Sequence, residues 1–505
     1  MHAFINSGPF APCPTPFNLA AYVLAAGQAT PDKIALQVLG LTGAERWSYG
    51  ALTRAVQGIG NGFLQAGLLP GDRVLLRLGN TVDFPLAFLG AIAVGLVPVP
   101  TSSQLTGPEI TAMATQIAPA AVVAAPGIAC PEGAMPVIEA QTLHSWRGLP
   151  PCDWALGDPE RLAYLIFTSG TSGRARAVMH AHRAVWARRM MWQGWYGLTP
   201  QDRLLHAGAF NWTYTLGTGL MDPWAIGATA LIPGPDVGVA QLPLLLKRFD
   251  ATIFAAAPGV YRQMLRAGMP QLPRLRHGLS AGEKLPEATR TEWVRVTGTQ
   301  VHEALGMSEV STFISASPLR PATSGASGHV QPGRRVAVLG PDAAPVPRGV
   351  AGVLAVGAED PGLFLGYWGQ PEETAAKFAN GWFLTGDTVS MDDTGGIHYL
   401  GRDDDMMNAG GYRVSPLEVE KAMNACPGVL ESAAVELRVN ETTGVIGLFY
   451  VADDPAPEAG ALQAHAQATL ARYKQPRLWL AVDALPKAAN AKINRRALRE
   501  GYRPT

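Results

Sequence analysis

Short apolar runs rich in β-branched residues alternate with longer helical stretches along most of this chain. Strands are predicted at residues 74–78, 97–99, 121–124, 229–232 and 252–256. Helices are predicted between and after them, at residues 82–95, 108–116, 241–249 and 260–267. Strands and helices that alternate at this spacing favour parallel βαβ units, with sheets covered by helices on both faces.

The pattern changes twice toward the C-terminus. Residues 327–368 carry short strands between Pro and Gly turns, which is typical of a small β-barrel or meander. A charged, turn-like piece follows at residues 401–405, and the rest of the chain has α+β patterning. We therefore predict an α/β fold with a large N-terminal domain, residues 1–402, of parallel αβαβα-type sheets plus a small β-barrel. Residues 403–505 are expected to form a small, mobile α+β C-terminal domain.

Composition narrows the class of protein. Hydrophobic residues make up 48% of the 505 and charged residues 16%, as in well-packed soluble enzymes. Lys plus Arg and Asp plus Glu both number 40, so no net field favours nucleic acid or an anionic membrane as a partner. The four cysteines lack CxxC spacing, which argues against a zinc site or a disulfide framework. With no signal-peptide pattern and no membrane-spanning run, we expect a cytoplasmic protein, and a homodimer stays open.

A loop of small hydroxyl residues and glycines is the most informative stretch. A buried strand at residues 164–167 is followed by Thr168, Ser169, Gly170, Thr171, Ser172 and Gly173. Backbone N–H groups and hydroxyls in such a loop can surround phosphate oxygens, and Arg174 and Arg176 can neutralise their charge. No Gly-Lys-Ser/Thr step is present, so this is not a GxxxxGK[ST] P-loop. A solvated hairpin is the competing interpretation.

Three further blocks add candidate chemistry. Small residues at 280–283 could let a flat ring lie against the backbone, although a plain turn before a helix has the same composition. Glu309 follows Ser308 after a glycine, and one carboxylate beside phosphates is chemically sufficient for Mg²⁺. Asp387 ends the run GWFLTGD, where a carboxylate held by a tight Thr-Gly turn can accept both hydroxyls of a ribose.

Two blocks near the C-terminus follow. Residues 403–405 are three adjacent aspartates, whose mutual repulsion suits an exposed pivot or a plain linker. Gly410 and Gly411 would allow a slender ligand to approach closely. Lys492 stands in the stretch LPKAANAKINRR; on composition alone such a lysine is a solvated surface group.

Together these blocks resemble, in order and over nearly the whole chain, the adenylate-forming (ANL) superfamily, in particular its acyl-CoA synthetases and benzoate-type ligases. GWFLTGD matches that family's pattern outright, whereas Ala175, Arg176, Leu305, Asn490 and Ala491 depart from it. The resemblance implies ATP or AMP contacts from residues 168–173, Arg176, Ser280, Ala281, Gly282, Glu283, Asp387 and Arg402. It implies Mg²⁺ at Glu309, catalysis by Lys492, Glu309, Thr168 and Ser308, a hinge at Asp404, and CoA contacts from Gly410, Gly411 and Tyr412.

The acid is the weakest part of the prediction. Aromatic residues near a glycine would make a compact apolar pocket, unless they simply fill the core. The residues concerned are Phe210, Asn211, Trp212, Tyr214 and Gly217, with Gly282 and Gly306 leaving room for a ring. We expect a small aromatic acid, with a short or medium aliphatic acid as the alternative. No basic residue clearly sits in this stretch, which disfavours a dicarboxylate.

The predicted reaction is ATP-dependent formation of an acyl-AMP and transfer of the acyl group to CoA. A carrier-protein or amine acceptor is the nearest rival, with an oxidative step as in luciferases a third form of it. A nucleotide-binding sensor that kept the fold is the alternative outside catalysis. Intact Glu309, Asp387 and Lys492 argue against the sensor.

Overall fold

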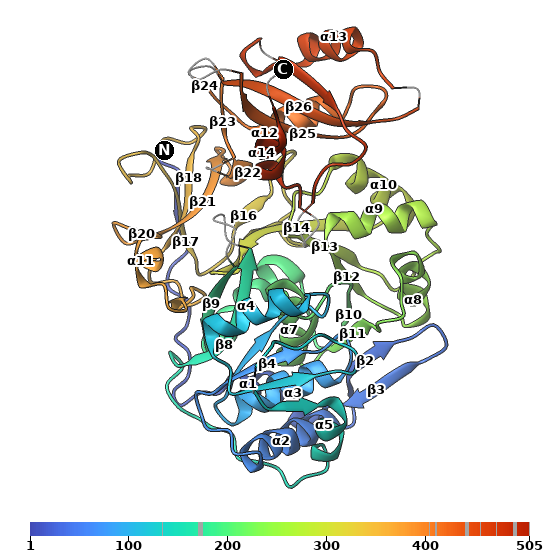
Figure 1. Ribbon diagram of the computed structural model, residues 1–505, viewed down its shortest axis with the longest axis vertical. Coiled ribbons are helices and arrows are strands. Elements are labelled where there is room, and N and C mark those ends of the chain that lie inside the picture. The colour runs from blue at the N-terminus through green and yellow to red at the C-terminus, as the bar shows by residue number, and fades with distance from the viewer. Residues whose placement is uncertain are drawn as a thin grey trace. The chain divides into compact units, whose positions relative to one another are not determined.

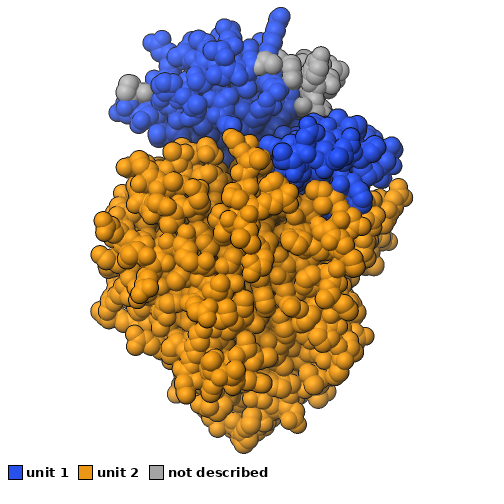
Figure 2. Space-filling model, turned by 180° about the vertical axis from the view of Figure 1, so that it is seen from behind, with its two compact units in different colours: residues 1–4, 336–355, 384–505 blue, residues 5–335, 356–383 orange. Residues whose placement is uncertain are grey.

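The computed structural model describes residues 1–503 apart from 134, 170–174, 403–404, 410–411, 440–443, 455, 471 and 488–491. The chain divides into two compact units (Figure 2). The large unit comprises Ile5–Arg335 and Val356–Phe383, and the small unit comprises Met1–Phe4, Val336–Ala355 and Leu384–Thr505. The boundary predicted after residue 402 stays a prediction.

The first predicted set of alternating elements forms a parallel sheet in the large unit. Strand β4 (Arg73–Arg77) pairs in parallel with β5 (Val97–Pro100) and β6 (Ala121–Ala124), and helices α3 (Asp83–Ala93) and α4 (Gly107–Ile117) connect them. Val74 and Leu76 are buried in a core that contains α3, whereas Leu75 is buried in a second core that contains α4. Alternate residues of one strand therefore face two layers, which confirms the prediction of sheets covered on both faces.

A second, larger parallel sheet carries most of the candidate site residues. In the order β11-β10-β12-β13-β14 its strands are Thr229–Pro233, Arg203–His206, Ile253–Ala256, His277–Ala281 and Gln300–Met307. Helices α8 (Leu242–Arg248), α9 (Pro258–Ala267) and α10 (Glu287–Thr297) lie along one face of it (Figure 1). The carboxyl ends of these parallel strands meet at one edge, which is where ligands bind in open α/β sheets.

Two antiparallel additions complete the large unit. Strand β15 (Ser311–Ser315) turns back along β14, and β16 (Gly328–Val330) pairs with β15. In a separate three-stranded sheet, β9 (Ala175–Ala181) lies between β8 (Leu162–Ser169) and β19 (Gly366–Tyr367). The other large-unit helices include α1 (Leu19–Ala25), α2 (Tyr49–Gln65), α5 (Ala140–Trp146), α6 (Ala184–Ala187) and α7 (Asp222–Ile226).

The small unit has the expected α+β character in its C-terminal part. Strand β25 (Val429–Arg438) pairs antiparallel with β26 (Gly444–Ala452), and β27 (Leu478–Ala481) pairs in parallel with β26. Its helices are α12 (Pro416–Met423), α13 (Ala459–Thr469) and α14 (Arg495–Gly501). Strands β17 (Arg335–Leu339) and β18 (Gly352–Gly357) form where short strands were predicted. Among the described residues, none of the helices combines the length and apolarity that a bilayer crossing requires.

Candidate functional site

Glu309 lies in a tight turn between two antiparallel strands. The turn spans residues 308–310 between β14 and β15, and the Val310 N–H donates to the carbonyl of Met307 at 3.3 Å. Glu309 is only 8% exposed, and its own carbonyl accepts from the Phe364 N–H at 2.7 Å. Ser308 beside it is half-buried. The carboxylate is thus a built-in feature of the large unit rather than a solvated side chain at a helix start.

Tyr367 holds that carboxylate in place. The Tyr367 hydroxyl donates to Glu309 Oε1 at 2.7 Å. Burial, and then the charge of Glu309, raise the pKa of Tyr367, so the phenol keeps its proton and remains a donor. Sequence reasoning gave Tyr367 no role, because it lies 58 residues from Glu309. Its place in the run Gly366-Tyr367-Trp368 was the only signal available.

Arg176 approaches the same tyrosine from the neighbouring strand. Its guanidinium carbon lies 5.3 Å from the centroid of the Tyr367 ring, within the range of a cation–π contact. Its Nε lies 2.6 Å from Oε2 of Glu373 on helix α11 (Pro371–Ala375). The predicted phosphate-binding cation and the predicted magnesium carboxylate therefore contact the two ends of one side chain.

The hydroxyl-rich loop is the tip of a β-hairpin. Thr168 and Ser169 are the last residues of β8, where they pair with Arg176 and Ala175 of β9. The prediction that both belong to a loop was wrong, because cross-strand pairing extends β8 beyond the apolar run. Gly170, Thr171, Ser172 and Gly173 lie outside the described residues, as does the side chain of Ser169.

The predicted adenine segment follows a buried strand, as expected. Ser280 and Ala281 end β13, and Gly282 follows with φ +94°. A Cβ placed on Gly282 would meet nothing within 4 Å, so the backbone there is open to a flat group. Ser280 Oγ is buried with no hydrogen-bond partner in the described part of the chain. Glu283, next along, is half-buried.

The small unit groups the residues predicted to contact ribose. Asp387 on β21 (Trp382–Met391) is paired in register with Arg402 on β22 (Gly396–Arg402). Arg402 Nη1 lies 3.3 Å from Asp387 Oδ1, and the Tyr399 hydroxyl lies 3.4 Å from the same oxygen. Burial raises the pKa of Asp387, and the charges of Arg402 and Lys492 oppose that rise. Lys492 is thus electrostatically coupled to the carboxylate that we expect to bind ribose.

Lys492 itself is exposed. An isolated bridge pairs Lys487 with Ile493, and the Asn494 N–H donates to the carbonyl of Pro486 at 2.8 Å. Asn494 also caps α14 by accepting from the Ala497 N–H. These contacts fix both ends of the segment that carries the lysine, whereas residues 488–491 lie outside the described residues.

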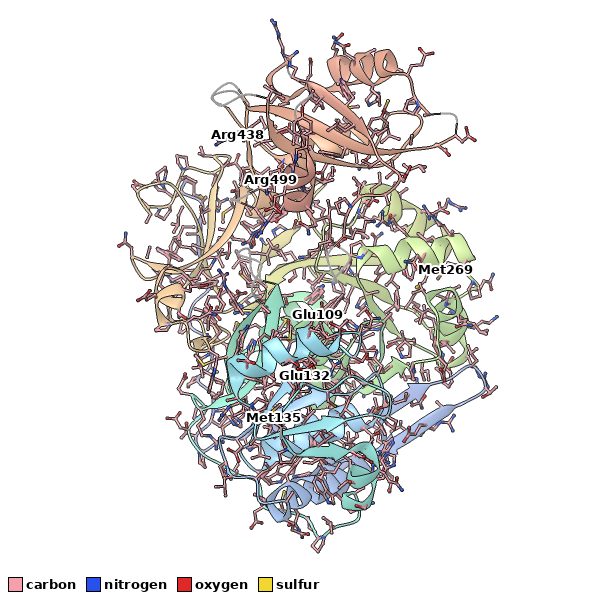
Figure 3. The ribbon with its side chains drawn as sticks, viewed as in Figure 1. Glu109, Glu132, Met135, Met269, Arg438 and Arg499 are labelled. Carbon is pink, nitrogen blue, oxygen red and sulfur yellow. The ribbon has the colours of Figure 1, made fainter. Side chains whose placement is uncertain are left out.

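Parts of the predicted hinge and CoA segment are described. Asp404, Gly410 and Gly411 lie outside the described residues, and Tyr412 is described only as backbone at the start of β24 (Tyr412–Val414). Asp405, next to the hinge position, lies 3.0 Å from Arg499 Nη2 and 3.7 Å from Arg495 Nη1. Arg499 belongs to helix α14 (Figure 3). Asp405 is therefore ion-paired, which the prediction of three mutually repelling aspartates did not include.

The predicted acyl segment is only partly core. Phe210 is 2% exposed and stacks on Phe84 at 4.9 Å, while Asn211 and Trp212 are half-buried. The Tyr214 hydroxyl donates to the carbonyl of Leu279 at 3.2 Å. Residues Thr215–Met221 form a π-helical segment, a form frequent at functional sites that no sequence pattern here indicated.

Two glycines of this region have a structural role as well. A Cβ on Gly306 would lie 2.3 Å from the Ser311 carbonyl oxygen, so the close approach of β14 and β15 requires glycine. A Cβ on Gly217 would lie 2.1 Å from the Arg188 guanidinium. The reasoning that these glycines leave room for a substrate ring therefore has a competing explanation at both positions.

The guanidinium against Gly217 belongs to a buried ionic network. Arg188 Nη2 lies 2.6 Å from Asp222 Oδ2, and both side chains are at least nine-tenths buried. Asp222 also accepts from the Tyr196 hydroxyl at 2.7 Å, and Arg188 Nη1 donates to Ser311 Oγ. Burial alone would favour the neutral forms, but the charge of Asp222 raises the pKa of Arg188 and keeps it charged. Sequence reasoning missed this pair.

Comparison with known proteins assigns the chain to a class. Residues 24–368 match the AMP-binding enzyme family, and residues 418–492 match the AMP-binding enzyme C-terminal domain. The chain belongs to the AMP-binding enzyme family, as the sequence motifs predicted. Among the described residues, no group of three or more His, Cys, Asp or Glu side chains is arranged to hold a metal ion.

Individual relatives are similar over nearly their whole length. A benzoate–CoA ligase of Thauera aromatica is 31% identical, over 95% of this chain and 92% of its own. The crystal structure of a benzoate CoA ligase from Burkholderia xenovorans LB400 has a TM-score of 0.85 and 28% identity, covering 96% and 100%. ATP-bound MatB from Rhodopseudomonas palustris has a TM-score of 0.88 and 27% identity, covering 99% of both chains.

Proposed function

We propose that this protein is an AMP-forming acid–CoA ligase. It would join a carboxylic acid to the α-phosphate of ATP, release pyrophosphate, and pass the acyl group of the acyl-AMP to the CoA thiol. The observation that carries the proposal is the buried Glu309, hydrogen-bonded by Tyr367 and linked through that ring to Arg176, in a chain of the AMP-binding family.

The residues fit the charge problem of adenylation. The attacking carboxylate and the triphosphate are both anionic, so the site must neutralise charge and hold the two groups in line. Glu309 would hold Mg²⁺, whose chemistry when bound is to neutralise phosphate oxygens; a single carboxylate beside phosphates suits this ion. Thr168, Ser308 and Arg176 would position the phosphates. Lys492 would supply a second positive charge.

Nucleoside binding and thioester formation complete the proposal. Ser280, Ala281, Gly282 and Glu283 would contact the adenine, and Asp387 with Arg402 the ribose. We propose that residues 403–505 move about Asp404 relative to residues 1–402, so that Gly410, Gly411 and Tyr412 guide the pantetheine arm of CoA. A cytoplasmic location and a homodimer stay predictions.

The favoured acid is small and aromatic. Two benzoate ligases are among the relatives, and Tyr214 with half-buried Trp212 and Asn211 offers a compact, flat-walled lining. The backbone opening at Gly282 adds room beside it. A short or medium aliphatic acid is the alternative that the same lining would accept.

Two assays test the proposal. Exchange of labelled pyrophosphate into ATP should require an acid, and benzoates should support it better than straight-chain acids. AMP release should then increase when CoA is added. No exchange with any acid would contradict the proposal and favour a nucleotide sensor. Exchange without CoA-dependent AMP release would favour a carrier-protein or amine acceptor.

A further inference from the structure

Two buried polar side chains without partners lie beside the predicted acyl segment. His206, the last residue of β10, is 1% exposed, and neither of its ring nitrogens has a hydrogen-bond partner among the described residues. Thr215, the first residue of the π-helical segment, is fully buried, and within the same described ranges its Oγ1 is also unpartnered. Buried polar atoms are nearly always hydrogen-bonded, so each of these needs an explanation.

The two groups flank one point of the backbone. A Cβ placed on Gly208 would lie 2.2 Å from Thr215 Oγ1 and 3.1 Å from His206 Nδ1. The backbone of the π-helical segment closes over the histidine, because a Cβ on Gly219 would lie 2.9 Å from His206 Cβ. The imidazole stands edge-on to Tyr214, with ring centroids 4.4 Å apart and planes at 75°. His206 and Thr215 therefore converge beside the aromatic ring expected to line the acyl pocket.

The chemistry of the pair defines what it could bind. Burial lowers the pKa of His206 to about 3, so the imidazole is neutral near pH 7 and offers one N–H donor and one nitrogen acceptor. Thr215 adds a hydroxyl that can donate or accept. Neither side chain carries charge, so an ionised substituent would find no counter-ion in this pair. A hydroxyl or amino group matches the pair, because each can donate and accept.

We infer that His206 and Thr215 form a polar subsite of the acyl pocket that recognises a hydroxyl or amino substituent on the ring of an aromatic acid. The inference rests on the proposed function and refines its substrate class. Benzoate itself would leave both side chains unpaired, and a site built around a polar group discriminates strongly against the analogue that lacks it.

The test compares kcat/KM for benzoate with kcat/KM for each hydroxy- and aminobenzoate isomer. In the wild type, at least one substituted acid should be preferred over benzoate by about 10-fold or more. Thr215→Val, which keeps the side-chain shape, and His206→Leu should each reduce that preference toward one. His302→Leu is the matched control, since His302 is also buried with its pKa lowered to about 3, but its ring contacts His277. The control should keep the preference of the wild type.

Three results would separate the inference from the function. Preference for benzoate over every substituted isomer overturns the inference, as does an unchanged preference in both variants, and the proposed ligase activity survives either result. Failure of the wild type to activate any acid sinks the proposed function itself. If His206→Leu does not fold, Thr215→Val decides the question alone.

Discussion

Glu309 and Lys492, the two charged groups on which adenylation is expected to depend, have opposite settings. Glu309 is buried in a turn of the large unit and is hydrogen-bonded by Tyr367. Lys492 is exposed in the small unit, on a segment fixed at its ends by residues 486–487 and 493–494. A buried carboxylate is preorganised at a cost in folding free energy, whereas an exposed ammonium costs little until the substrate is bound. Substitutions on the two sides should therefore separate stability from activity.

The largest effect is expected from the buried network beside the Glu309 turn. Asp222→Leu would leave the Arg188 guanidinium buried without its counter-ion, and should reduce the free energy of unfolding by about 3–5 kcal/mol. Urea unfolding measures it. The double variant Arg188→Met with Asp222→Leu should recover most of the loss, because it leaves no unpaired charge. A single variant as stable as the wild type would mean that this side is not held by the pair.

The second test breaks the comparison from the exposed side. Lys492→Ala should slow acid-dependent pyrophosphate exchange about 100- to 1,000-fold, the usual effect of removing one preorganised positive group. The free energy of unfolding should change by about 0.5 kcal/mol or less, because the side chain is exposed. Lys487→Ala, which removes a nearby lysine paired with Glu431, is the matched control and should keep the exchange rate. Undiminished exchange in Lys492→Ala would contradict the catalytic role.

The third test asks what the hydrogen bond to Glu309 contributes. Tyr367→Phe should raise the Mg²⁺ concentration for half-maximal exchange about 10-fold or more, because groups that orient a metal ligand typically contribute that much to metal affinity. It should also reduce unfolding free energy by about 1.5–3 kcal/mol. Tyr399→Phe removes a hydroxyl near Asp387 and should leave the Mg²⁺ requirement unchanged. An equal shift in both variants would argue against the link to Glu309.

The smallest effect concerns acid stability of the large unit. Burial, and then the charges of Arg188 and Arg183, lower the pKa of His180 to about 3. Below pH 6.5 the unfolded chain binds a proton that the folded chain refuses, so stability falls as the pH drops toward 3. His180→Phe should flatten this fall by about 1.4 kcal/mol per pH unit between pH 6 and pH 4, measured by urea unfolding. Identical slopes would show that His180 titrates alike in both states.

Much of the fold was predictable because periodicity and turn residues are local signals. The strand at 121–124 has the predicted bounds, and the helix expected at 108–116 spans Gly107–Ile117. The hairpin was less accessible, since Thr168 and Ser169 join β8 only through pairing with β9. Local sequence cannot report such pairing, because tertiary contacts override the propensity of a short polar run.

The site shows the same limit. Glu309, Asp387 and Gly282 were found because each lies in a compact motif, whereas Tyr367 reaches Glu309 across 58 residues. Arg188 and Asp222 are 34 residues apart, so the absence of a basic residue from the acyl segment itself was misleading. The π-helical form of Thr215–Met221 likewise depends on its surroundings.

The Arg188–Asp222 pair has a consequence for which acids the protein could evolve to accept. Asp222 occupies the guanidinium as an anion supplied by the chain itself, directly against Gly217. A diacid that reached this wall would encounter a cation already neutralised, which gives a structural basis for selecting monoacids. A neutral residue at 222, tolerated in a sufficiently stable background, would expose that cation and open an evolutionary route toward doubly charged acids.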